Sequence, residues 1–242
     1  MARHGKTVLA VIPARGGSKS IPRKNLCPLA GRSLVARAAD TALALAWIDR
    51  AIISTDDEEI AAEARRAGLD CPFMRPPALA GDRAGSADMW RHAWLSAEEH
   101  YGGRFDISVL LEPTSPLRRP EDIEAAVDLL IESGRKAVAT VSPNPAHFTP
   151  QKTLTLNDEG TIGFFPVAGG HRATRQEIPD YFHKNGVCYA LQRATLVDEG
   201  HIVEDDCAAL VIERPLVNID EPFELELAEW LLARENAQSA SS

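Results

Sequence analysis

Runs of apolar residues alternate along the first two thirds of the chain with segments in which apolar residues recur at helical spacing. This alternation is typical of βαβ units that build a mostly parallel sheet. The apolar runs predict strands at residues 8–12, 51–55, 107–111 and 137–141. Because the first run is apolar at every position, we expect its strand to lie in the centre of the sheet.

Helical spacing around these strands predicts four helices, which begin at or next to Ser33, Asp56, Ser86 and Pro120. Asp56 and Glu59 match a capping box, in which two side chains satisfy free backbone N–H groups at a helix start. Gly68 and Gly134 are expected to end two of the helices, because glycine readily adopts the left-handed backbone after a last turn. The order of elements predicts a doubly wound α/β fold.

The pattern changes between Pro143 and Gly186, where proline, glycine and histidine accumulate. An alternating stretch at residues 153–156 runs into the turn sequence of residues 157–160, which predicts a hairpin. We interpret residues 143–186 as an insertion that projects from a single domain formed by residues 1–242.

After the insertion, apolar runs predict strands at residues 187–190 and 208–212, followed by a last helix that starts at Pro222. We expect the inward face of this helix to consist of Phe223, Leu227, Trp230 and Leu231. Residues 237–242 are expected to form a frayed tail.

Charge and cysteine content narrow the classes of ligand and of compartment. A formal net charge of -9 argues against a broad surface for nucleic acid, so a polyanionic ligand should be small and held by a local cluster of bases. The four cysteines occur singly, which argues against a zinc ribbon or a disulfide scaffold and favours a cytoplasmic protein. No signal peptide and no apolar run of bilayer length is recognisable, so we expect no membrane association of the chain's own.

The candidate chemistry begins directly after the first strand, in the run Pro13–Asn25, which contains two glycines, two serines and four basic residues. Open α/β sheets bind ligands at the carboxyl ends of their strands, where glycines let backbone N–H groups approach phosphate oxygens. The run matches neither a Walker A loop nor the G-x-G-x-x-G dinucleotide motif. It predicts a phosphate-binding loop, and the alternative is a solvated basic loop.

This run resembles the first motif of the acylneuraminate cytidylyltransferases, also called CMP-sialic acid synthetases. Further segments resemble that family in the same order along nearly the whole chain, namely residues 54–56, 75–76, 79–82, 111–118, 175–176, 185–186 and 218–220. The resemblance implies a Rossmann-like nucleotidyltransferase fold, with a mostly parallel sheet flanked by helices. Residues 143–186 would then be a small dimerisation subdomain, exchanged across a homodimer so that it contributes to the partner's sugar site.

The activity that the resemblance implies is transfer of CMP from CTP to the anomeric hydroxyl of a nine-carbon 2-keto-3-deoxy acidic sugar, with release of pyrophosphate. Matching positions give a nucleotide site composed of Ala14, Arg15, Gly16, Ser18, Lys24, Asn25, Arg75, Ala84 and Ser86. Arg15 and Lys24 would hold the phosphates and act in catalysis, while Arg75 and Ser86 would contact the cytosine or its ribose. Without the resemblance, the alternative for Arg75 is a surface charge, and the alternative for Ser86 is a helix cap.

The resemblance also implies a Mg²⁺ cofactor, with Asp220 as a catalytic carboxylate and metal ligand. Here the chain departs from the family pattern, because Asn218 stands where the family often has a second aspartate. A neutral amide removes one charge, so we expect weaker binding of Mg²⁺. The alternative is that Asp220 only begins the last helix, where acidic residues interact favourably with the helix dipole.

The residues that match the sugar site are Glu112, Lys152, Arg175 and Asn185. Lys152 and Arg175 would bind the sugar carboxylate, although Arg175 is also compatible with a basic patch at a dimer surface. Glu112 is a second departure, because the family commonly has glutamine there. An ionised glutamate only accepts hydrogen bonds, so we expect it to face hydroxyl or amide N–H groups of an acceptor other than ordinary N-acetylneuraminate.

Two alternatives to this function remain. The first is CMP activation of a legionaminic, pseudaminic or octulosonic acid. The second is a non-catalytic regulator that binds CTP, which the neutral Asn218 in the expected metal site would suit.

Overall fold

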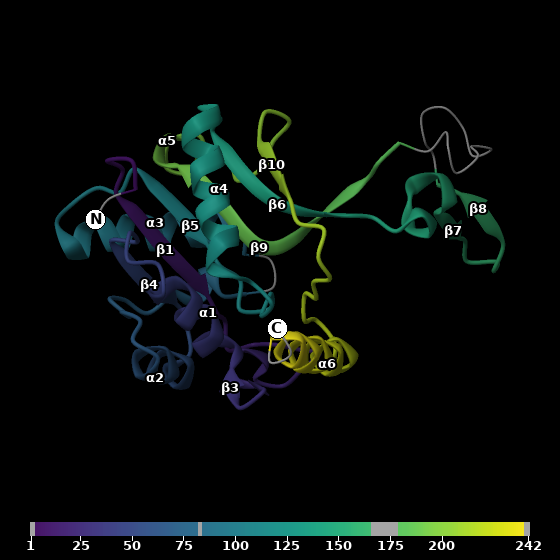
Figure 1. Ribbon diagram of the computed structural model, residues 1–242, viewed down its shortest axis with the longest axis horizontal. Helices are drawn as coiled ribbons and strands as arrows, with labels where there is room; N and C mark the ends of the chain where they lie inside the picture. The colour runs from purple at the N-terminus through teal and green to yellow at the C-terminus, as the bar shows by residue number, and fades with distance from the viewer. Residues whose placement is uncertain (1–2, 82–83, 166–178, 240–242) are drawn as a thin grey trace.

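The computed structural model describes residues 3–81, 84–165 and 179–239. Its centre is a six-stranded sheet in the order β10-β6-β9-β5-β1-β4 (Figure 1). These strands span Ala208–Val211, Ala137–Pro143, Phe182–Gln192, Ile107–Leu110, Val8–Pro13 and Arg50–Ser54. Every neighbouring pair is parallel except those of β9, which runs antiparallel to both β5 and β6. The predicted mostly parallel α/β sheet is confirmed.

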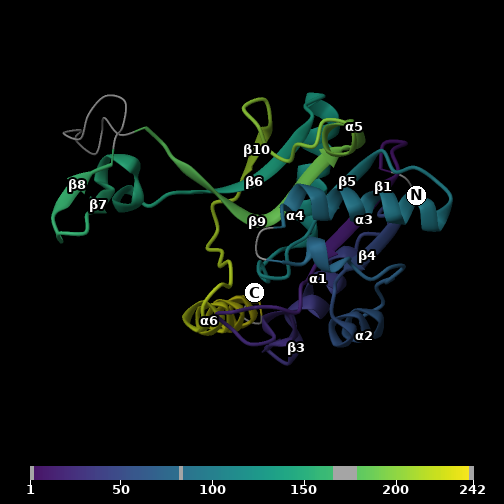
Figure 2. The same cartoon turned by 180° about the vertical axis from the view of Figure 1, so that it is seen from behind.

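Alternate residues of β1 belong to two separate hydrophobic cores, because successive side chains of a strand point to opposite faces of the sheet. Val8 and Ile12 pack with α1, α2 and α4, whereas Leu9 packs with α3 and α5. These helices span Leu34–Leu43, Glu58–Arg66, Pro120–Ser133, Ser86–Tyr101 and Arg193–Val197. Both faces are therefore covered by helices, as Figures 1 and 2 show from opposite sides.

The helix starts follow the predicted positions, but the residue that caps α2 differs. Ser33 Oγ accepts the N–H of Ala36 at 3.2 Å, as a cap of α1 should. The capping box at Asp56 is wrong, because the carboxylate of Asp57 caps α2 by accepting the N–H groups of Glu59 and Ile60. Asp56 lies one residue too early, and its side chain bonds to another loop instead.

The last helix, α6, spans Pro222–Ser239 and so extends into the segment expected to fray, of which residues 240–242 lie outside the described part. It packs against β2 (Pro28–Leu29), which pairs with β3 (Arg32–Ser33), and Ala228 is its fully buried residue. Phe223 and Trp230 are 69% and 55% exposed, so their predicted inward orientation is wrong. Leu227 and Leu231 do pack on the core beneath α6.

An arm projects from the sheet where β6 and β9 continue beyond it (Figure 1). Its end contains a two-stranded hairpin of β7 and β8, which span Leu154–Leu156 and Ile162–Phe164. The predicted hairpin is confirmed. The expected strand at residues 187–190 is only part of β9, which begins inside the segment interpreted as an insertion.

Within the described ranges, no helix has both the length and the apolar character needed to cross a membrane.

Candidate active site

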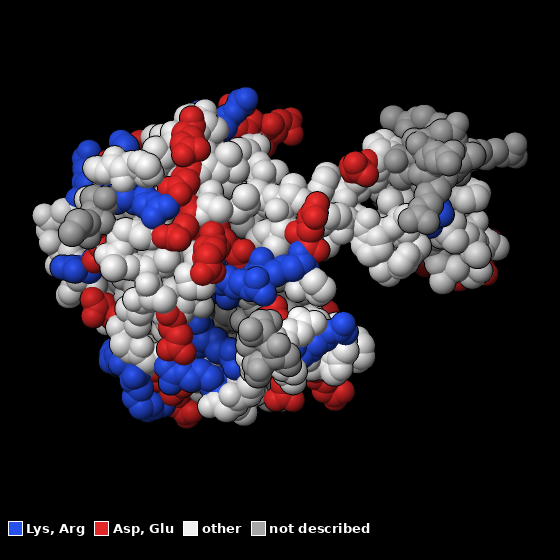
Figure 3. All heavy atoms as spheres, viewed as in Figure 1, with Lys and Arg blue, Asp and Glu red and all other residues white. Residues whose placement is uncertain are grey.

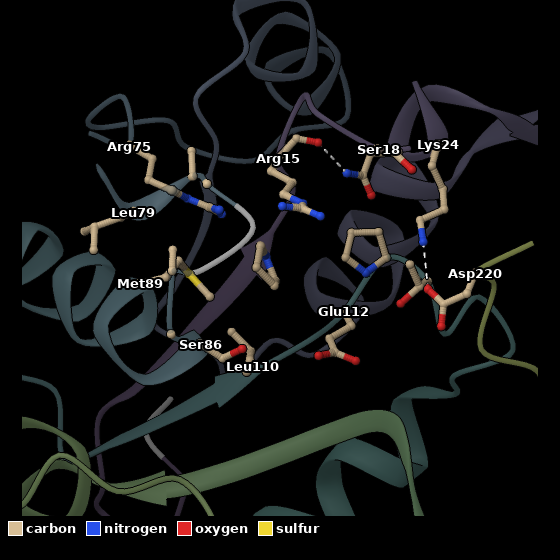
Figure 4. A pocket seen from close by; sticks show the side chains of 18 residues that line it. Arg15, Ser18, Lys24, Arg75, Leu79, Ser86, Met89, Leu110, Glu112 and Asp220 are labelled. Carbon is tan, nitrogen blue, oxygen red and sulfur yellow. Dashed lines mark hydrogen bonds and ion pairs between the residues drawn. The ribbon is translucent and has the colours of Figure 1, made fainter. Parts of the chain in front are cut away.

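A cavity of about 360 Å³ opens near the carboxyl ends of β1 and β5 (Figure 4). Among the described residues, its charged lining residues are Arg15, Lys24, Arg75, Glu112 and Asp220. Seven of the nine residues predicted to bind nucleotide line it, namely Arg15, Ser18, Lys24, Asn25, Arg75, Ala84 and Ser86. The other two, Ala14 and Gly16, belong to the loop after β1 but are not among the lining residues.

The loop after β1 is held in shape by side chains from other segments. The N–H of Gly16 donates to Asp56 Oδ1 at 3.0 Å, and Asn25 Nδ2 donates to the carbonyl of Arg15 at 3.0 Å. A Cβ atom on Gly16 would lie 2.7 Å from Asp57 Oδ2, so a larger residue would push the loop away from the start of α2. Glycine is therefore required here by the close approach to Asp57.

Lys24 joins this loop to a segment almost two hundred residues later. Its Nζ lies 2.8 Å from Asp220 Oδ1 and donates to the carbonyl of Ile219 at 2.9 Å. The hydroxyl of Ser20 also donates to the carbonyl of Asp220. The three residues predicted to be catalytic, Arg15, Lys24 and Asp220, thus line the same cavity.

Asn218 and Asp220 lie on one side of an extended segment, in which Val217 and Ile219 are buried and the two polar residues are exposed. Asp220 lines the cavity, whereas Asn218 does not and instead lies near Gly186. Among the residues that the structure describes, no cluster of three or more His, Cys, Asp or Glu side chains is arranged to hold a metal. The two residues predicted to hold Mg²⁺ offer one carboxylate and one amide.

Arg75 is buried at 6% exposure, which excludes the interpretation as a surface charge. Its Nε donates to Ser54 Oγ at 3.1 Å, and a second N–H donates to the carbonyl of Ser54. Burial lowers the pKa of Arg75 to about 10, while the nearby charge of Asp56 acts in the opposite direction. Arg75 therefore remains a cation at neutral pH and lies in the cavity wall.

Ser86 is the first residue of α3 and lines the cavity, but it does not cap the helix. The cap position is Gly85, and no side chain accepts a hydrogen bond there. The interpretation of Ser86 as a cap is therefore wrong, and its hydroxyl lies beside the cavity (Figure 4).

Glu112 lies opposite the phosphate loop in a turn held by a residue that the sequence analysis missed. Arg118 is buried, and its guanidinium donates to the carbonyls of Glu112 at 2.8 Å and Gly186 at 3.1 Å, and to that of Val187. Burial lowers the pKa of Arg118 to about 10. The sequence signal for this residue was the arginine that ends the segment of residues 111–118. An arginine that is buried needs several hydrogen-bond acceptors and can therefore hold neighbouring segments together.

Burial also raises the pKa of Glu112; the charge of Arg118 opposes this shift and that of Asp220 adds to it. Gly186 provides the space for this carboxylate. Its φ is +70°, a left-handed conformation. A Cβ atom at this position would lie 2.6 Å from both Glu112 Oε2 and Ser115 Oγ. The same Cβ would lie 3.5 Å from Asn218 Nδ2. The two residues that depart from the family pattern therefore lie next to each other over Gly186.

Two other residues predicted to bind sugar, Asn185 and Lys152, are not among the lining residues of the cavity. Asn185 is buried, with its Oδ1 accepting from Thr140 Oγ1 at 2.6 Å and from the N–H of Val187, and its Nδ2 donating to Ser142. Its side chain is engaged within the protein. Lys152 is exposed and lies in the arm, in the short helix η4 (Pro150–Lys152). Arg175 lies outside the described residues.

A family model described as Cytidylyltransferase matches residues 9–158, which include the phosphate loop, Arg75 and Glu112. The chain belongs to the cytidylyltransferase family. It is thus an enzyme of the nucleotidyltransferase class, and the resemblance found in the sequence is confirmed.

Similar proteins cover nearly the whole of this cytidylyltransferase. The chain is 28% identical to a pseudaminic acid cytidylyltransferase of Campylobacter jejuni, over 96% of this chain and 98% of that protein. It is 29% identical to a CMP-N,N'-diacetyllegionaminic acid synthase of Legionella pneumophila, over 93% and 96%. It is 30% identical to an N-acylneuraminate cytidylyltransferase of Escherichia coli, over 96% of this chain and 53% of that protein.

The fold is also that of a solved structure of CMP:2-keto-3-deoxy-manno-octonic acid synthetase complexed with CTP. The TM-score is 0.72 at 19% identity, over 95% of this chain and 99% of that one. The Rossmann-like nucleotidyltransferase fold expected from the sequence is thereby confirmed.

The space above Gly186 gives a stability prediction. Gly186→Ala should reduce the free energy of unfolding by more than Gly102→Ala, measured by urea denaturation. Both glycines have nearly the same φ, +70° and +69°, but a Cβ on Gly102 meets nothing within 4 Å. The left-handed backbone should cost each variant about 1–2 kcal/mol, and the contact with Glu112 and Ser115 adds to the loss only at Gly186. Equal losses would show that Glu112 and Ser115 move aside freely.

Proposed function

We propose that this cytidylyltransferase transfers CMP from CTP to the anomeric hydroxyl of a nine-carbon 2-keto-3-deoxy acidic sugar and releases pyrophosphate. The observation that supports this most is the single cavity in which Arg15, Lys24 and Arg75 lie on the side of the loop after β1, and Glu112 on the opposite side (Figure 4). The relatives named above act on pseudaminic, legionaminic and N-acylneuraminic acids, according to their names.

In the proposed reaction, the anomeric oxygen forms a bond to the α-phosphorus of CTP. The bond from this phosphorus to the bridging oxygen of the β-phosphate breaks, pyrophosphate leaves, and the hydroxyl proton passes to water. Negative charge grows on the phosphate oxygens during this step, so fixed positive charges nearby lower the barrier. Lys24 and Arg15 supply these charges from the cavity wall.

We infer that a Mg²⁺ ion would be held by Asp220 in the cavity and by Asn218 near it. A magnesium ion on a nucleotide needs only one or two protein carboxylates, because phosphate oxygens and water complete its shell. Asp220 would supply the carboxylate, and Asn218, on the same side of its segment, would act through its carbonyl or through water. The bound ion would neutralise phosphate charge. Lys24, which pairs with Asp220 in this structure, would then be available to the phosphates.

The acceptor should lie near Glu112, on the far side of the cavity from the phosphate loop. The carboxylate of Glu112 is partly buried, and when it is ionised it can only accept hydrogen bonds. Hydroxyl or amide N–H groups of the sugar at this point would complement it, and the change from the family's glutamine favours an acceptor other than ordinary N-acetylneuraminate. Legionaminic and pseudaminic acids belong to this nine-carbon class, and an octulosonic acid is the shorter alternative.

We also propose that the protein is a homodimer joined through the arm. In the hairpin, Leu154 pairs with Phe164 and Leu156 with Ile162, so these four apolar side chains lie on one face. They are 51%, 62%, 72% and 67% exposed, in that order. On the described part of the arm, Figure 3 shows few charged side chains, whereas acidic and basic side chains are interspersed over the body. A second copy would cover this face and bring the partner's Lys152 to the sugar.

The proposed activity is tested by measuring pyrophosphate release from CTP with a panel of 2-keto-3-deoxy acids. A nine-carbon acid should give the highest kcat/KM, and no release with any acid would contradict the proposal. Lys24→Ala should lower kcat with the best acid by about 100- to 1000-fold, because one fixed charge at the reacting phosphate is lost. Lys136→Ala removes a surface lysine that pairs with Glu199 and should leave kcat unchanged. Near-normal turnover of Lys24→Ala would remove Lys24 from the reaction.

The role of Glu112 is tested by Glu112→Gln, which keeps the shape of the side chain and restores the residue common in the family. We expect the ranking of acids in the panel to shift toward N-acetylneuraminate, seen as changes in kcat/KM of about tenfold or more, since a charged hydrogen bond contributes about 1.5–3 kcal/mol. The KM for CTP should stay constant. An unchanged ranking would mean that Glu112 does not contact the acceptor.

The dimer is tested by Leu156→Asp, which places a charge on the apolar face of the hairpin. Sedimentation should give twice the chain mass for the unmodified protein and the mass of one chain for the variant, because an unpaired charge in an apolar contact is costly. Thr155→Asp changes the opposite face of the same strand and should remain a dimer. A monomeric unmodified protein would contradict the proposal.

A further inference from the structure

The segment from Ser54 to Asp56 follows β4 and was recognised in the sequence without a role. In the structure it surrounds the guanidinium that lines the cavity. Ser54 Oγ accepts from Arg75 Nε at 3.1 Å, and the Ser54 carbonyl accepts a second N–H of the same group. The Thr55 carbonyl accepts the backbone N–H of Arg75 at 2.7 Å. Both the backbone and the side chain of Arg75 are thus fixed by two consecutive residues.

This arrangement is rigid because it is buried. Ser54 and Thr55 are fully inaccessible, and Arg75 is 6% exposed. Within the described part of the chain, no carboxylate forms a hydrogen bond or an ion pair with Arg75, so Ser54 supplies the acceptors that hold the guanidinium in place. The remaining N–H groups are directed toward the cavity (Figure 4).

The same segment also holds the phosphate loop. The Ser54 carbonyl accepts the N–H of Ala14 at 3.0 Å, and Asp56 Oδ1 accepts the N–H of Gly16 at 3.0 Å. Arg75 and the loop after β1 are therefore attached to the same strand end. A nucleotide whose phosphates lie on the loop would meet Arg75 at a fixed distance.

We propose that Ser54 is a specificity-determining residue, which positions Arg75 so that its N–H groups select the base of the nucleotide. A directed donor complements cytosine, whose N3 and O2 atoms both accept hydrogen bonds. It opposes uracil, whose N3 carries a hydrogen. A site built around such a donor rejects a base that lacks the acceptor, because a buried polar group is then left unpaired. This inference rests on the proposed use of CTP.

The test is calorimetric binding of CTP and UTP in the presence of Mg²⁺, which requires no sugar. The unmodified protein should bind CTP more tightly than UTP. Ser54→Ala should raise the Kd for CTP about tenfold, within the roughly 5- to 150-fold range expected for a buried donor left without its acceptor. The Kd for UTP should change little, so the ratio of the Kd for UTP to the Kd for CTP should fall by the same factor.

The matched control is Ser108→Ala, which removes another fully buried serine hydroxyl of the same sheet. Ser108 Oγ accepts from Trp90 Nε1 at 2.9 Å and does not line the cavity. This variant should lower the thermal midpoint about as much as Ser54→Ala but keep the ratio of the two Kd values. In an Arg75→Ala background, Ser54→Ala should change the ratio no further, because the group that it positions is absent.

An unchanged ratio in Ser54→Ala, or equal narrowing in Ser108→Ala, would overturn the role of Ser54. A further narrowing in the Arg75→Ala background would also overturn it, since Ser54 would then act without Arg75. Equal affinity of the unmodified protein for CTP and UTP would instead contradict the proposed use of CTP itself.

Discussion

The buried cation of Arg118 is the constraint on which the acceptor end of the site depends. A guanidinium away from water is strongly unfavourable unless its N–H groups find acceptors, and here they bond to backbone carbonyls on both sides. One side is the turn that carries Glu112, and the other is the left-handed Gly186 of β9. Satisfying one charge therefore fixes two segments almost seventy residues apart and defines the space above Gly186.

The nucleotide end is organised by a different principle, the shared edge at which parallel strands end. The loop after β1, the segment after β4 and the turn after β5 all begin at this edge. Hydrogen bonds then join them, as where the N–H of Gly16 donates to the carboxylate of Asp56. Lys24 and Ser20, both in the loop after β1, then bond to Asp220 and bring it to the same place. Positive charge is thus concentrated in one cavity of a protein that carries a formal net charge of -9.

The sequence was sufficient to predict what depends on local chemistry. Apolar runs located the strands, and the glycines and bases after β1 located the phosphate loop. The errors occurred where tertiary contacts decide between neighbouring options. Asp56 and Asp57 are both good helix caps, but Asp57 caps α2 and Asp56 accepts the N–H of Gly16 instead. On α6, Phe223 and Trp230 fit a helical period as well as the true inner face, which the core around Leu29 selects. Asn185 matched a site motif, but a buried partner, Thr140, takes its side chain.

The long strand β9 has a mechanical consequence. It passes without a break from the arm into the centre of the sheet, and its pairing with β6 shifts register between Ala139 and Val141, close to where Gly186 lies. A register shift locally bends and twists a strand pair, so this point sets the direction in which the arm leaves the body. The direction of the arm and the space next to Glu112 therefore both depend on the backbone of β9 at Gly186.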